Sequence, residues 1–215
     1  MSFLSKLFGS DPGPRRGDGP VTLAERINEL EAQAAQESAG YQGMPLNRAG
    51  DLCLEAGDKG EALKFYGRAI NALLEDQQRE AARGVANKII RVHPGAVRTL
   101  CTLTWLDLAS HHLATALLHL RDYVEGVLRV NQQDLAKDHV MEMARVVPEV
   151  EFLDAVADAL DRMGWPTEAS RVRDWSAEGG SPASMRDPDE LSTYCMHAAV
   201  GSNLNRRAEG EGEGE

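Results

Sequence analysis

Apolar residues recur every three to four positions along residues 21–178 of this chain. Such spacing is typical of amphipathic α-helices, and no stretch shows the strict alternation of apolar and polar residues that indicates a β-strand. The pattern predicts a leading helix at 22–38 and eight further helices at 45–56, 59–74, 77–92, 95–109, 113–128, 132–146, 149–163 and 166–177. Because the intervening turns are short, neighbouring helices should form antiparallel hairpins. The expected fold class is all-α.

The breaks between the predicted helices have identifiable causes. Gly57 can end a helix in the left-handed conformation, and Asp58 can then cap the helix that follows. Pro94 and Pro148 cannot continue the helices that precede them. Asn131 is expected to cap the helix that begins after it.

The predicted hairpins begin near residues 45, 77, 113 and 149, so they repeat at intervals close to 34 residues. In the first hairpin, the residues at the positions of a known helical repeat motif are Leu46, Ala49, Gly50, Cys53, Gly57, Ala62, Tyr66 and Ala69. With these residues the chain resembles a tetratricopeptide repeat (TPR). The last hairpin repeats the theme with Leu153, Val156, Ala157, Leu160, Gly164 and Ala169.

The resemblance has departures, and they leave an alternative open. Leu46 stands where the repeat has Trp, Cys53 replaces an aromatic residue, and Leu74 replaces Pro. The helices between residues 76 and 147 keep the expected lengths but not the motif. The alternative to a short TPR-like α-solenoid is therefore a plain helical bundle. Glycine inside a helix costs about 1 kcal/mol and usually has a packing reason, which favours the solenoid.

The resemblance implies a concave face that holds a peptide or another protein. On this reading, the first hairpin would direct Asn47, Asp51, Leu54 and Glu55 toward the groove. The last hairpin adds an acidic stripe at helical spacing, made of Glu151, Asp154, Asp158 and Asp161. A basic partner segment would fit this stripe, although charged stripes on helices more often only face water.

A basic helix face lies between these two hairpins in the sequence. Its members are Arg79, Arg83, Lys88 and Arg91. This face could receive an acidic partner or the chain's own acidic sequence EGEGEGE, and the alternative is a solubilising surface.

The two ends differ in composition from the helical zone. Residues 1–20 contain a short apolar segment with Phe3, Leu4, Leu7 and Phe8, followed by a Pro- and Gly-rich tether. This segment is expected to contact a membrane surface or to dock into another protein, and the alternatives are that it packs on the first helix or is disordered. Residues 179–215 are expected to be a mostly disordered acidic tail with one short helix near 188–200, which Asp187 would cap and Gly201 would end.

Composition narrows the classes of function. The net charge of -11 disfavours nucleic-acid binding. Three widely spaced cysteines favour a reducing compartment, and no apolar run approaches the roughly 20 residues of a membrane span, so a cytoplasmic protein is expected. No metal, cofactor or catalytic motif is recognisable.

We therefore expect a non-catalytic adaptor that binds a protein or peptide. The alternatives are a membrane-associated assembly factor, tethered by its first residues, and a small enzyme that uses His119, Cys101 or the acidic stripe.

Overall fold

The computed structural model describes residues 22–37 and 41–204, and within them every regular element is an α-helix. The helices are α1 (Leu23–Gln36), α2 (Gly43–Glu55), α3 (Lys59–Glu75), α4 (Arg79–Val92), α5 (Val97–Ala109), α6 (Leu113–Val130), α7 (Gln133–Val146), α8 (Val150–Arg162), α9 (Pro166–Glu178) and α10 (Pro188–Leu204). The predicted all-α fold class is confirmed. The residues of the N-terminal apolar segment and of the acidic sequence at the end lie outside the described ranges.

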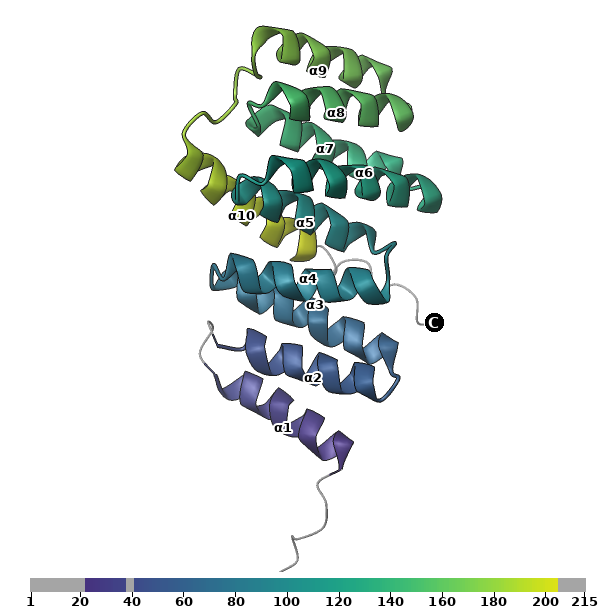
Figure 1. Cartoon of the computed structure of the whole chain (residues 1–215), viewed down its shortest axis with the longest axis vertical. Coiled ribbons are helices and arrows are strands. Elements are labelled where there is room, and N and C mark those ends of the chain that lie inside the picture. The colour runs from purple at the N-terminus through teal and green to yellow at the C-terminus, as the bar shows by residue number, and fades with distance from the viewer. Residues whose placement is uncertain (1–21, 38–40, 205–215) are drawn as a thin grey trace, which may run out of the picture.

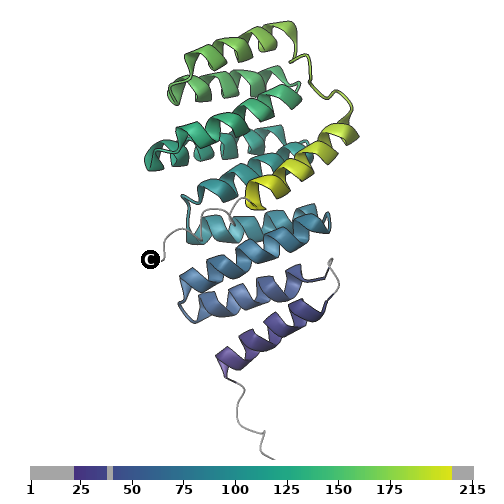
Figure 2. The same cartoon turned by 180° about the vertical axis from the view of Figure 1, so that it is seen from behind.

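The helices α1 to α9 pack in chain order and form an elongated array (Figure 1). In that view α4, α6 and α8 lie in front of α3, α5 and α7, and Figure 2 shows the opposite face. Neighbouring helices run antiparallel because their connections are short. The array is the stack of hairpins that the sequence pattern predicted.

Two of the predicted helix boundaries are set as expected, and a third is not. Gly57 has a φ of +84°, and the Asp58 Oδ1 atom accepts a hydrogen bond from the Glu61 N–H at 3.0 Å. Asn131 does not cap α7. It instead ends α6 with a φ of +55°, because asparagine tolerates the left-handed conformation in which many helices terminate.

Small residues lie where the two helices of the first hairpin, α2 and α3, pack closely against each other. Gly50 is buried, and a Cβ atom placed on it would lie 2.6 Å from Cε1 of Tyr66. Ala62 and Ala69 on α3 are fully buried. In the last hairpin, Ala157 and Ala169 are fully buried and Gly164 follows α8 with a φ of +90°. Gly50 therefore occupies a close contact and the alanines are buried, whereas Gly57 and Gly164 lie in turns where an added Cβ would meet nothing within 4 Å.

Helix α5 forms the centre of the core. All of its residues from Thr99 to Ala109 are buried, and Trp105 is the largest fully buried side chain. Helix α5 is covered by α4, α6 and α10. Thr104 donates a hydrogen bond to the carbonyl oxygen of Leu100 at 2.9 Å, so its hydroxyl is satisfied inside the helix.

The C-terminal helix α10 returns to the middle of the array (Figure 2). It packs on α5 and α3 and buries Leu191, Cys195 and Ala199. Asp187 caps it as expected, since its Oδ1 atom accepts the Glu190 N–H at 3.1 Å. The helix continues through Gly201 to Leu204, beyond the expected end at residue 200, and Ser202 in this extension is buried against Thr102 of α5. The expected boundary at residue 178 therefore does not separate α10 from the array.

Candidate functional site

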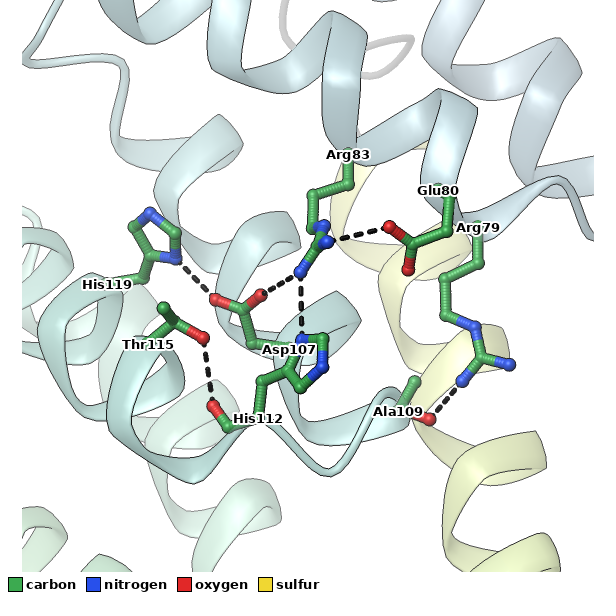
Figure 3. Close-up of polar contacts among 8 residues, drawn as sticks. All are labelled: Arg79, Glu80, Arg83, Asp107, Ala109, His112, Thr115 and His119. Carbon is green, nitrogen blue, oxygen red and sulfur yellow. Dashed lines mark hydrogen bonds and ion pairs between the residues drawn. The ribbon is translucent and has the colours of Figure 1, made fainter.

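A buried carboxylate joins three helices near the middle of the array (Figure 3). Asp107 on α5 is 1% exposed. Its Oδ2 atom lies 2.6 Å from Nδ1 of His119 on α6, and its Oδ1 atom lies 3.4 Å from Nη1 of Arg83 on α4. A buried charge is costly unless it is paired, and here both carboxylate oxygens have partners.

The arginines of α4 extend this cluster to its neighbours (Figure 3). Arg83 donates to Glu80 Oε2 at 2.7 Å and lies 2.9 Å from Nδ1 of His112. Arg79 donates to the carbonyl oxygen of Ala109 and, at 3.1 Å, to the Ser192 hydroxyl on α10. Arg79 and Arg83, which belong to the predicted basic face, are thus engaged in contacts between helices.

The cluster can orient an imidazole, because Asp107 holds Nδ1 of His119. The hydroxyl drawn beside it, that of Thr115, donates to the backbone carbonyl of His112 at 3.0 Å. Cys101 lies on the same helix as Asp107, and burial raises the pKa of its thiol to about 12. The contacts of Asp107 with His119 and Arg83 act between helices, which makes the cluster a link between α4, α5 and α6.

The sequence reasoning did not identify Asp107. The available signal was a single acid in a mostly apolar helix, whose other polar residues are Arg98 and three threonines. A charged residue in such a helix must find a partner on another element. The spacing to His119 does not by itself show that the two side chains meet.

The structure brings together two sets of residues that were predicted to bind different partners. Lys88 on α4 donates to Asn47 Oδ1 at 2.9 Å and to Asp51 Oδ1 at 2.7 Å, both on α2. The Tyr66 hydroxyl also donates to Asp51, at 2.7 Å. Asn47, Asp51 and Lys88 thus form a link between α2 and α4. Beside them on α2, Leu54 is half-buried.

The remaining predicted positions lie at the surface or contact other residues. Arg91 and Glu55 are exposed. In the acidic stripe of α8, Asp154 accepts a hydrogen bond from Ser176 at 2.6 Å. Arg173 on α9 contacts Asp158 and Asp161, and Glu151 is exposed. The stripe is therefore a surface feature whose charge is partly neutralised.

An apolar groove of about 320 Å³ lies between the start of α1, the end of α2 and the start of α3. We call it the N-terminal groove. Its apolar lining includes Leu23, Ile27, Cys53 and Phe65, and its acidic lining consists of Glu31, Asp58 and Glu61. Burial raises the pKa of the Cys53 thiol, and these three carboxylates raise it further. Two of these carboxylates have basic partners, because Lys64 pairs with Glu61 and Arg68 pairs with Glu31, so the acidic charge of the groove is partly neutralised.

A second cleft, of about 470 Å³, lies between α10 and the turn that joins α3 to α4. Its lining mixes apolar residues such as Leu74 and Met196 with Arg79 and His197. Within residues 22–37 and 41–204, no group of three or more His, Cys, Asp or Glu side chains is arranged to hold a metal ion.

These features define the class of protein as an all-helical array of hairpins, compatible with a helical repeat protein. Comparisons with protein-family models, with curated proteins and with solved structures give no match for this chain. Among the described helices, none has the length and apolar character needed to cross a membrane.

Proposed function

We propose that the protein is a TPR-like, non-catalytic scaffold of the cytoplasm that binds a basic, amphipathic segment of another protein. The N-terminal groove carries this proposal, because it combines an apolar lining with three carboxylates. A bound helix could place apolar side chains at i, i+3 and i+4 against the groove, with Lys or Arg beside Glu31, Asp58 and Glu61.

Two of the helices that form the groove, α2 and α3, are stabilised by packing against each other, which lowers the cost of binding. Ala49, Ala62 and Ala69 are fully buried between α2 and α3, so this hairpin is already ordered. Most of the ordering entropy would then be lost by the partner segment. The acidic stripe of α8 is a second candidate surface for a basic partner. Of the two aspartates that pair with Arg173, Asp158 is the more exposed.

The binding test uses a fluorescent synthetic helix of Leu and Lys residues as a basic amphipathic probe. Glu61→Lys places a positive charge in the groove and leaves the Asp58 cap of α3 in place. We expect this variant to bind the probe about tenfold more weakly in fluorescence anisotropy, because like charges repel at a rim. Glu178→Lys, an equal charge change at the end of α9, should bind the probe as the wild type does.

Equal weakening by Glu61→Lys and Glu178→Lys would contradict the proposal, because it would show attraction to the net charge of -11 rather than to the groove. The α8 stripe has its own test, in which Asp154, Asp158 and Asp161 are changed to Lys. Unaltered probe binding by that variant would exclude the stripe as the binding surface.

A further inference from the structure

The N-terminal groove opens where the chain enters α1. Leu23 and Ile27, from the first two turns of α1, line the groove, and Leu23 is 40% exposed. The residues that precede α1 therefore leave the described structure beside an apolar surface that nothing in residues 22–37 and 41–204 covers fully.

The preceding part of the sequence has the composition that the groove would accept. Phe3, Leu4, Leu7 and Phe8 place four large apolar side chains within six positions, and Lys6 lies among them. Residues 1–20 contain three basic residues and two acidic ones, a net charge of +1, whereas the whole chain carries -11. Apolar surface and charge are therefore both complementary to the groove.

The connecting residues are long enough for this segment to reach the groove. Residues 9–22, which are 14 in number, separate Phe8 from Leu23. At about 3.3 Å per residue they can span up to about 46 Å. Helix α1 also has 14 residues and is about 21 Å long, so the linker can fold back along all of it.

We propose that the segment from Phe3 to Phe8 occupies the N-terminal groove of its own chain and competes there with the partner. This inference rests on the proposed function, because the same apolar and acidic lining would receive both ligands. The covalent link gives the segment a high effective concentration at the groove. A partner would then have to displace it before binding.

Cys53 provides a reporter of occupancy, because it lines the groove and is 4% exposed. The test variant is the full chain with Phe3, Leu4, Leu7 and Phe8 all changed to Ser. We expect N-ethylmaleimide to alkylate Cys53 about fivefold faster in this variant. If the segment fills the groove of the wild type about 80% of the time, Cys53 is accessible in only about one fifth of the molecules. Cys101 and Cys195, which are buried elsewhere, should react at unchanged rates and thereby exclude general unfolding.

A charge exchange tests the complementarity. Lys6→Glu and Glu61→Lys should each accelerate the alkylation of Cys53, and the double variant should recover most of the protection. A synthetic peptide of residues 1–10, added in excess to the Ser variant, should also restore protection. Failure of the double variant and of the peptide to restore it would overturn the proposal.

Three other outcomes would also overturn it. An equal rate for Cys53 in the wild type and the Ser variant would show that the segment does not fill the groove. Protection that increases with protein concentration would place the segment in the groove of a second copy. Loss of flotation with anionic lipid vesicles in the Ser variant, with no change at Cys53, would assign the segment to a membrane surface.

The inference and the proposed function can fail separately. If the Leu-Lys probe binds the Ser variant in a Glu61-dependent manner while Cys53 shows no protection in the wild type, the groove binds a partner and only the inference fails. If the probe does not bind the Ser variant, the proposed function fails.

Discussion

At the scale of single residues, two glycines inside helices have opposite surroundings. A Cβ atom at Gly50 would lie 2.6 Å from the Tyr66 ring, which is fully buried, whereas a Cβ atom at Gly84 on α4 would meet nothing within 4 Å. Gly50→Ala should therefore lower the free energy of unfolding by about 1–3 kcal/mol through overpacking. Gly84→Ala should raise it by about 0.5–1 kcal/mol, because alanine is the better helix former. Urea unfolding measures both, and a Gly50→Ala variant as stable as the wild type would show that Tyr66 can move freely.

A second effect at the residue scale is a dependence of stability on pH. Burial lowers the pKa of His139 below its usual value of 6.5. Nδ1 of His139 lies 3.3 Å from the Tyr123 hydroxyl, and burial raises the pKa of that phenol, so the phenol can donate to a neutral imidazole. The folded state thus favours neutral His139. This contribution is complete above about pH 6.5, and it is lost as the pH falls from there through the lowered pKa of the folded state.

His139→Gln removes the titrating group and provides the test. Urea unfolding of the wild type at pH 7.5 and pH 5.5 should show a larger loss of stability than the same comparison for the variant, with ~pH 6.5 as the onset set by the unfolded histidine. An identical loss in both proteins would mean that His139 does not contribute. A larger loss in the variant would reverse the sign of the argument.

At the scale of helices, Asp107 couples α5 to α4 and α6. Asp107→Asn keeps the size of the side chain but removes the charge that pairs with His119 and Arg83. Because hydrogen bonds to a charged group contribute about 1.5–3 kcal/mol, the variant should lose a free energy of unfolding in that range. The control is Glu80→Gln, whose side chain is 65% exposed and should change stability by less than about 0.5 kcal/mol. Equal effects of the two changes, measured by circular dichroism in urea, would contradict a linking role for Asp107.

The helices themselves could be predicted from the sequence because their causes are local. Periodicity located α1 to α9, and turn chemistry located Gly57 and Asp58 correctly. Asn131 was assigned to the wrong helix, because the same residue type can cap a helix start or end one in the left-handed conformation. The prediction of Gly50 as a tight contact succeeded because glycine within a helix usually has a packing reason.

At the scale of the whole molecule, prediction from sequence was limited by contacts between distant residues. The Thr102 and Ser202 hydroxyls, 100 positions apart, lie 3.0 Å from each other, and this contact fixes α10 on α5. The sequence of residues 179–215 predicted a short helix near 188–200, but it did not show that this helix would pack on α5. The lining of the N-terminal groove likewise comes from three helices, so no single stretch of sequence shows it.

The array should have a gradient of stability from its edge to its centre. In α1 the one buried residue is Ala34, whereas α5 is buried from Thr99 to Ala109. In a linear array each helix is stabilised by its neighbours, and a terminal helix has them on one side only. We therefore expect the amide hydrogens of α1 to exchange about 100-fold faster than those of α5, a difference of about 3 kcal/mol in opening free energy.

Hydrogen exchange followed by mass spectrometry measures this gradient, and equal protection of α1 and α5 would mean that the array opens as a single unit. The gradient also determines how a partner reaches the N-terminal groove, because α1 forms one of its walls. If α1 opens readily, a bound segment that contacts Leu23 and Ile27 should slow the exchange of α1 while leaving that of α5 unchanged. Slowed exchange of α1 in the presence of the Leu-Lys probe, absent in Glu61→Lys, would therefore place the bound probe at α1 by a measurement that is separate from the anisotropy titration.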